Sequence, residues 1–225
     1  MTRHPRERAR AAVIFDLDGV LTDTAELHFQ SWLELARELD IPFDRRANEA
    51  LRGLSRADSL RLFLGEHAAR FTPDQQADIM ARKNARYLER VSRMTPDDAL
   101  PGAGKLLETL RARRVPTAVA SSSKNAQLVL DKLGVRAFFD AIVDGNDVER
   151  SKPDPQLFLA AAERLGVPAA RCVVVEDAES GVTAARAAGM EVVGVGPIER
   201  VGRADRVVAS LRELSAEMLL GLAGP

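Results

Sequence analysis

The sequence predicts an α/β protein with a Rossmann-like core, in which helices flank a parallel sheet, and an inserted helical cap domain. The core is predicted by short apolar runs that alternate with amphipathic stretches of about ten residues, a pattern typical of βαβ units. The insert is predicted because no convincing strand occurs between residues 25 and 94. We therefore expect a core of residues 1–24 and 95–225, with residues 1–11 as a frayed tail, and a cap of residues 25–94.

Six apolar runs are expected to form the strands. They are AAVIF (11–15), VPTAVA (115–120), AIV (141–143), CVVVE (172–176), EVVGV (191–195) and RVVA (206–209). Stretches such as GKLLETLRARR, NAQLVLDKLG and PQLFLAAAERLG lie between them and carry apolar residues at helical spacing. The crossovers between parallel strands should be right-handed.

The interval between the first two runs has the periodicity of helices. In AELHFQSWLELARELD (25–40), apolar residues recur on one helical face. Further on, Thr72 and Gln75 form a capping box with Pro73 at the first helical position, so a helix is expected from there to about residue 93. The chain should pass between core and cap at hinges near residues 23–25 and 93–99.

The composition of the chain argues against several classes of protein, including nucleic-acid-binding and membrane proteins. The chain has 225 residues, of which 46% are hydrophobic, enough to bury a sizeable core. A net charge of −1 gives no reason to expect a nucleic acid or a membrane as partner, and no apolar run reaches the length of a membrane span. The one cysteine, Cys172, lies in an apolar run, so we expect a buried residue and a cytoplasmic protein. The basic first ten residues lack the apolar segment of a signal peptide.

Polar residues follow the predicted strands where a ligand would bind. In an open parallel sheet, ligands bind beyond the carboxyl ends of the strands. These positions hold Asp16 and Asp18 after the first run, SSSKN (121–125) after the second, Lys152 in the segment after the third, and Glu176 and Asp177 at the end of the fourth. Any one of them could cap a helix, but their occurrence at successive strand ends favours one shared site.

Carboxylates at this edge of the sheet suit a divalent cation. Asp16, Glu176 and Asp177 would supply hard oxygen ligands, and water and a phosphate oxygen would complete the shell that Mg²⁺ prefers. Histidines and cysteines are too few there for zinc. The ion would offset repulsion among the acids and neutralise phosphate charge in a transition state, while Ser121 and Lys152 bind the same phosphate.

Asp16 and Asp18 lie two positions apart, and two carboxylates this close repel each other at neutral pH. Their presence together therefore suggests that the site uses both. Asp16 can attack phosphorus and form an aspartyl-phosphate. Asp18 can protonate the leaving oxygen and then deprotonate the next attacking group. A carboxyl group does both only if it can be protonated near neutral pH, which a shielded site and negative neighbours favour. We interpret the pair as a nucleophile and its acid–base partner.

Longer segments of the sequence resemble the motifs of a known family. DLDGVLTDT, SSSKN, SKPDP and VEDAESG, in this order, resemble the four motifs of the haloacid dehalogenase-like phosphotransferases. TDTAELHFQSW, LRGLSRADSL, ARKNARYL and GVGPIERVG resemble the β-phosphoglucomutases within that superfamily. The resemblance implies an enzyme that interconverts β-D-glucose 1-phosphate and D-glucose 6-phosphate through an aspartyl-phosphate and β-glucose 1,6-bisphosphate, with Mg²⁺. We expect it to act as a monomer on a hexose phosphate.

The resemblance implies a role for each matching residue. Asp16 would be the nucleophile and a metal ligand, and Asp18 the acid–base, with its main-chain carbonyl on the metal. Glu176 and Asp177 would complete the protein ligands. The transferring phosphoryl group would be held by Ser121 and Lys152.

A second set would bind the sugar and its non-reacting phosphate. The second phosphate would be held by Arg56, Ser123, Lys124 and Asn125, and the sugar would lie near Trp32, Gly53, Leu54 and Lys83. His28 and Thr24 would be supporting residues, and His28 would help bring Asp18 into position as the cap closes. A bisphosphate that turns over needs an anchored phosphate at either end, so Arg56 and SSKN favour a mutase over a phosphatase.

Some positions depart from the family or allow a plainer interpretation. Arg52 stands where lysine is usual, Ser122 where alanine is common, and Ala178 where serine is common. Lys83 interrupts an apolar helical row, so it could face a wet cleft, or its stem could pack while the ammonium reaches solvent. His28 and Trp32, taken alone, would be structural residues of the core of the cap.

Other functions remain as alternatives. A sugar-phosphate phosphatase would use the same Asp16, Asp18 and metal, and would differ only in letting water reach the aspartyl-phosphate. A dehalogenase would not need Asp18. A phosphonate hydrolase could use Lys83 as a Schiff base but would leave the second phosphate set unexplained. A non-catalytic sugar-phosphate sensor predicts a broken nucleophile or metal set, and this chain keeps all four acids.

Overall fold

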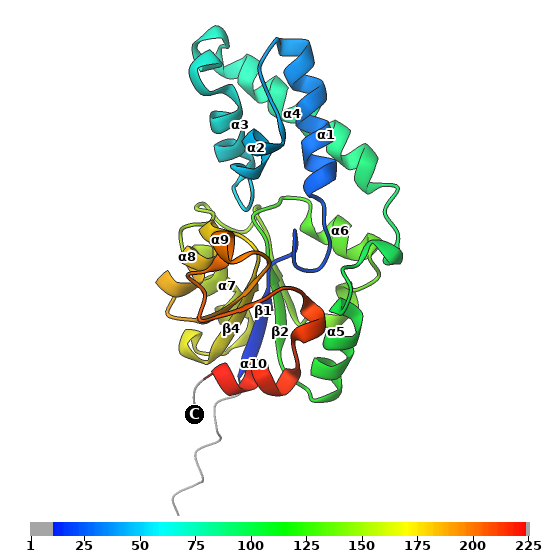
Figure 1. Ribbon diagram of the computed structural model, residues 1–225, viewed down its shortest axis with the longest axis vertical. Coiled ribbons are helices and arrows are strands. Elements are labelled where there is room, and N and C mark those ends of the chain that lie inside the picture. Colours follow the sequence, from blue (N-terminus) through cyan, green and yellow to red (C-terminus); the bar gives the residue numbers. More distant parts are fainter. Residues whose placement is uncertain (1–10, 224–225) are drawn as a thin grey trace, which may run out of the picture.

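A six-stranded parallel sheet forms the centre of the molecule in the computed structural model, which describes residues 11–223 (Figure 1). Its strands are β1 (Ala12–Phe15), β2 (Thr117–Ala120), β3 (Ala141–Val143), β4 (Cys172–Glu176), β5 (Glu191–Val195) and β6 (Arg206–Val208). They lie in the order β3-β2-β1-β4-β5-β6, and every neighbouring pair is parallel. All six predicted strands are thus confirmed. The tail predicted for residues 1–11 lies outside the described residues except for its last residue.

Helices cover both faces of the sheet because successive side chains of each strand point to opposite sides. Val13 and Phe15 of β1 belong to one buried cluster, and Ala12 and Ile14 belong to the other. The first cluster lies under α5 (Ala103–Ala112), α6 (Ala126–Lys132) and α10 (Ala216–Leu222). The second lies under α7 (Gln156–Leu165), α8 (Glu179–Ala187) and α9 (Ile198–Val201). Cys172 is buried, as predicted, and burial raises the pKa of its thiol to about 11.

Residues 25–94, where no strand was predicted, are mainly helical. They contain α1 (Ala25–Leu39), α2 (Arg45–Glu49), α3 (Arg56–Leu64) and α4 (Pro73–Val91), which we call the insert, with a short 3₁₀ segment at Gly65–Arg70. Figure 1 shows the insert beyond the edge where the strands end. Trp32, Phe63 and Ile79 are among the residues of an apolar cluster of its own.

Local sequence explains where the insert helices begin and end. Thr72 and Gln75 make the predicted capping box at the start of α4, which ends at Val91 rather than near residue 93. Ser55 accepts a hydrogen bond from the amide of Asp58 and caps α3.

Further 3₁₀ turns occur at Pro96–Asp98, Arg136–Phe138, Ala169–Arg171 and Leu211–Glu213. No helix within residues 11–223 is long and apolar enough to cross a membrane.

Candidate active site

Three buried carboxylates meet where β1 and β4 end. Asp16 follows β1, and its amide donates to the Val175 carbonyl of β4 at 2.9 Å. Glu176 is the last residue of β4, and Asp177 follows it. Oxygen atoms of Asp16, Glu176 and Asp177 all lie within 4.8 Å of one another, so the predicted convergence of the acids is present.

Lys152 lies among these acids. Its fully buried ammonium pairs with Asp16 and, at 2.9 Å, with Glu176. Burial alone would lower the pKa of Lys152, but the two carboxylates outweigh it and hold the pKa above its ordinary value. Burial raises the pKa of Asp16 well above its usual value, against the opposing effect of Lys152. Lys152 is therefore charged across the physiological pH range and can bind an anion beside Asp16.

Two glycines make room for the carboxylates. A Cβ at Gly181, in α8, would lie 1.6 Å from Glu176 Oε1. Gly19 has φ +88°, and a Cβ there would lie 2.0 Å from Asp177 Oδ2. The amides of Asp177 and Ala178 donate to Glu176 Oε2 and fix its orientation. This crowded set of hard oxygen donors fits a small divalent cation.

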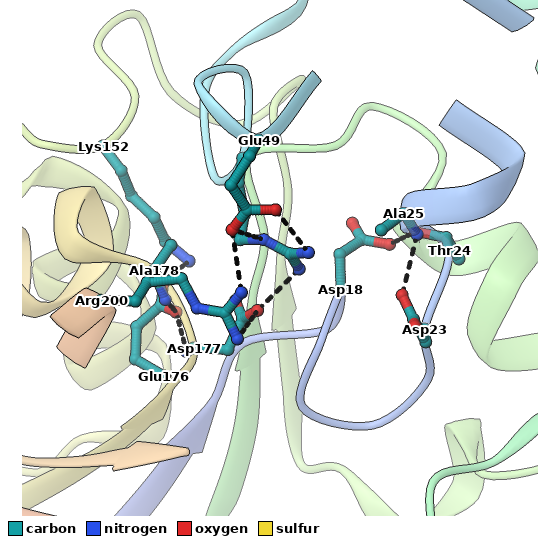
Figure 2. A network of polar contacts seen from close by, with 11 residues as sticks. Asp18, Asp23, Thr24, Ala25, Glu49, Lys152, Glu176, Asp177, Ala178 and Arg200 are labelled. Carbon is teal, nitrogen blue, oxygen red and sulfur yellow. Dashed lines mark hydrogen bonds and ion pairs between the residues drawn. The ribbon is translucent and has the colours of Figure 1, made fainter. Parts of the chain in front are cut away.

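Asp18 lies in the loop between β1 and α1. The Thr24 hydroxyl donates to Asp18 Oδ1 (Figure 2). Burial raises the pKa of Asp18, although the bond from Thr24 and the charge of Lys152 oppose the rise. A carboxyl group with a raised pKa can hold a proton closer to neutral pH, as an acid–base group must.

Lys83 of α4 turns inward. It is only 6% exposed, and its ammonium is hydrogen-bonded to His28 Nδ1 and lies 5.3 Å from the Trp32 ring centroid. The His28 ring stacks on Tyr87 at 4.2 Å between centroids. Burial, assisted by the charge of Arg56, lowers the pKa of Lys83 to about 7. The alternative in which the ammonium reaches solvent is therefore wrong.

A cavity lies between the insert and the loops of the core. The predicted site residues that line it are Asp16, Asp18, Thr24, His28, Trp32, Gly53, Leu54, Arg56, Lys83, Ser121, Ser123, Lys124 and Asn125. The predicted residues that do not line it, Lys152, Glu176 and Asp177, are buried. Trp32 also stacks on Phe63 at 4.5 Å, so it belongs to both the cavity wall and the core of the insert.

Asn84 lines this cavity and joins the insert to the core, and the sequence did not point to it. Its Oδ1 accepts from Arg56 Nη2 at 2.8 Å and from Asn125 Nδ2 at 2.9 Å. These residues come from α4, α3 and the residue before α6, so they are far apart in the chain. The available signal was its position beside Lys83, on the turn of α4 that faces the cavity.

Other lining residues were also outside the predicted set. They are Ala25, Asn48, Leu51, Arg52, Ser59, Tyr87 and Ser122. The Ser122 hydroxyl donates to the Gly53 carbonyl at 2.9 Å, so this departure from the family pattern adds a bond between core and insert. Ala178 leaves no hydroxyl at its position, and a Cβ at Gly53 would lie 3.0 Å from the Ala178 methyl group.

Two arginines reach Asp177. Arg52 Nη1 lies 2.8 Å from Asp177 Oδ2, and Arg200 Nη2 lies 3.8 Å from the same oxygen. Arg52 Nε also lies 2.9 Å from Glu49 Oε1. Arg200 Nη1 lies 2.9 Å from the same oxygen (Figure 2). Burial and the charge of Glu176 nevertheless raise the pKa of Asp177 to about 7. The acids thus lie within a network that continues from the core into the insert.

Comparisons with known proteins identify the family. Residues 11–189 match the model of the family described as haloacid dehalogenase-like hydrolase. The chain is 46% identical to a β-phosphoglucomutase of Bacillus subtilis over 210 residues, which cover 92% of this chain and 93% of that protein. It is 36% identical to an Escherichia coli fructose-1-phosphate phosphatase, over 82% of this chain and 96% of that one.

The fold agrees with a solved relative. A crystal structure of β-phosphoglucomutase from Clostridium difficile superposes with a TM-score of 0.91 at 36% identity, covering 95% of this chain and 97% of that one. The chain belongs to the haloacid dehalogenase-like hydrolase family.

Proposed function

We propose that the protein is a β-phosphoglucomutase that interconverts β-D-glucose 1-phosphate and D-glucose 6-phosphate through an aspartyl-phosphate and β-glucose 1,6-bisphosphate. The observation that carries this proposal is a cavity lined by two sets of polar groups. Asp16 and Ser121 belong to one set, and Arg56 and Asn125, which meet through Asn84, belong to the other. A phosphatase needs only the first set, whereas a bisphosphate intermediate needs both. The 46% identity to a β-phosphoglucomutase supports the same function.

Phosphoryl transfer would use the two aspartates in turn. Phosphorylated Asp16 gives its phosphoryl group to the free hydroxyl of a bound hexose phosphate, and Asp18 takes the hydroxyl proton. The bisphosphate then binds the other way round. Asp16 attacks the other phosphate, and Asp18 returns the proton to the leaving sugar oxygen. Ser121 and Lys152 hold the transferring group at Asp16 in both steps.

The family implies a metal cofactor, and we propose Mg²⁺. Asp16, Glu176, Asp177 and the main-chain carbonyl of Asp18 would hold it. The ion would neutralise charge on the transferring phosphoryl group. The buried carboxylates within 4.8 Å of one another support this assignment, because they offer three hard oxygen ligands at one point.

Residues 25–94 would act as a cap that closes over the substrate. Gly53, Leu54, Lys83 and Trp32 would face the sugar, and Ser123 and Lys124 would join Arg56 and Asn125 at the second phosphate. His28 and Thr24 would position Asp18 when the cap is closed. We further propose a cytoplasmic monomer without nucleic-acid or membrane partners.

A split assay tests the proposal. The purified enzyme would receive β-glucose 1-phosphate, Mg²⁺ and a trace of β-glucose 1,6-bisphosphate, and glucose 6-phosphate and free phosphate would be measured in parallel. We expect fast formation of glucose 6-phosphate, little phosphate, and no product from the α-anomer. Release of phosphate equal to all substrate lost would instead identify a sugar-phosphate phosphatase, the function of the E. coli relative named above.

A further inference from the structure

An ion pair joins the insert to the core outside the cavity. Glu49 ends α2, and Arg200 lies in α9, 151 positions further along the chain. Their Oε1 and Nη1 atoms are 2.9 Å apart. Figure 2 shows Glu49 above the Arg200 guanidinium, with Asp177 below it. Neither Glu49 nor Arg200 lines the cavity, so they can affect a bound substrate only through the placement of other groups.

The place of Arg200 is built into the core. Gly196 has φ +120°, and a Cβ there would lie 2.7 Å from Arg200 Nη2, so the guanidinium packs over a glycine. The same nitrogen is 3.8 Å from Asp177 Oδ2. The Arg200 side chain is 26% exposed and that of Glu49 is 49% exposed. The pair therefore connects an acid of the site with the segment of the insert around Glu49, whose neighbours Asn48 and Leu51 line the cavity, through a contact that dissolved salt can reach.

We propose that Glu49 and Arg200 form a latch that holds the insert closed over the cavity and so favours phosphoryl transfer from Asp16 to a sugar hydroxyl over transfer to water. In both reactions the bond between phosphorus and the Asp16 oxygen breaks and Asp18 takes a proton. The new bond is to the sugar oxygen in one and to a water oxygen in the other, which releases inorganic phosphate. This inference rests on the proposed function.

Exclusion of water gives the latch its effect. A closed site admits the sugar hydroxyl that is already bound and keeps bulk water away from the aspartyl-phosphate. A partly exposed ion pair contributes modestly to the stability of the state that contains it. Breaking the Glu49–Arg200 pair should therefore change the equilibrium between the closed and open insert by about 1.5- to 5-fold. Arg200→Gln should therefore raise the phosphate released per glucose 6-phosphate formed by about 1.5- to 5-fold.

The test compares wild type, Arg200→Gln and Arg200→Lys. The lysine variant keeps the charge and should restore most of the wild-type ratio. The matched control is Arg186→Gln, which breaks the 2.6 Å ion pair with Asp205 within the core, where the side chain of Arg186 is 49% exposed. Raising the ionic strength from about 0.1 M to about 1 M shortens the screening length from about 10 to about 3 Å. The higher ionic strength should bring the phosphate released per glucose 6-phosphate by the wild type toward the value for Arg200→Gln.

A second readout does not depend on the reaction. Amide hydrogen exchange of residues 45–54 in the ligand-free protein should accelerate in Arg200→Gln and remain unchanged in Arg186→Gln. Unchanged exchange in Arg200→Gln would overturn the latch. Accelerated exchange with an unchanged ratio of phosphate to glucose 6-phosphate would show that the latch does not affect the choice between the sugar hydroxyl and water. If wild type makes no glucose 6-phosphate, the proposed function fails, while the exchange experiment still decides whether the latch exists.

Discussion

Arg56 provides the sharpest test of a second phosphate site. Its Nη2 donates to Asn84 Oδ1 at 2.8 Å, and Asn125 Nδ2 donates to the same oxygen at 2.9 Å. In Arg56→Ala, Asn84 Oδ1 keeps Asn125 as a donor, so no acceptor loses its only partner and little stability should be lost. The change therefore removes a guanidinium at the cavity wall, together with its contribution to the lowered pKa of Lys83.

The magnitude follows from the kind of bond that is lost. A hydrogen bond to a charged group contributes about 1.5–3 kcal/mol, and about 1.4 kcal/mol corresponds to a factor of ten. We expect kcat/KM for β-glucose 1-phosphate to fall about 10- to 150-fold in Arg56→Ala. Hydrolysis of acetyl phosphate, which presents no second phosphate, should change by less than about twofold.

Both activities would be measured on the same preparation, with a coupled dehydrogenase for glucose 6-phosphate and a phosphate assay for acetyl phosphate. Arg61→Ala is the matched control, because Arg61 lies on the same helix, has a 76% exposed side chain and pairs with Asp58 at 2.9 Å. It should leave both activities unchanged. Equal losses of both activities in Arg56→Ala would refute the assignment of Arg56 to a second phosphate.

Three further predictions concern the acid–base residue, the buried lysine and the metal site. Asp18→Ala should lower kcat by about 10²–10⁴-fold without comparable loss of hexose phosphate affinity by calorimetry, and a parallel loss of affinity would contradict an acid–base role. Because burial lowers the pKa of Lys83 to about 7, the unfolded chain binds a proton between about pH 7 and 10 that the folded protein does not. The stability of the wild type, measured relative to that of Lys83→Met by thermal denaturation, should therefore rise from pH 7 to pH 9. A stability difference between the two proteins that does not depend on pH would count against a buried neutral amine. Gly181→Ala would place a Cβ 1.6 Å from Glu176 Oε1 and should weaken Mg²⁺ binding in a titration. Gly104→Ala, where a Cβ meets nothing within 4 Å, is its control, and equal affinities in the two variants would refute the crowding argument.

The fold was predictable because local patterns decide it. Runs such as CVVVE are long enough and β-branched enough to specify buried strands, and the Thr72 capping box specifies where α4 begins. The end of α4 was less certain, since the residues after Val91 carry no strong stop signal. The acids were predictable for a related reason, because parallel strands bring their carboxyl ends to one edge whatever the details of packing.

The missed residues depend on long-range placement. Asn84 became a site residue only when α4 brought it between Arg56 and Asn125. Arg200 and Glu49 look like ordinary surface charges in the sequence, and their contact depends on how the insert sits on the core. No periodicity or motif encodes a pair separated by 151 positions, so the sequence pattern does not predict this contact.

The construction of the cavity bears on the choice between transferase and hydrolase. Around Asn84, the insert supplies Arg56 and the core supplies Asn125. Near the acids, Ser122 of the core bonds the Gly53 carbonyl of the insert, and Arg52 of the insert reaches Asp177 of the core. Because both polar clusters draw on both parts, a ligand that contacts both clusters also holds the two parts together. Inorganic phosphate or water contacts fewer of these groups. A sugar phosphate would thus stabilise the closed state in which water is excluded, and this coupling favours transfer over hydrolysis without any change in the nucleophile.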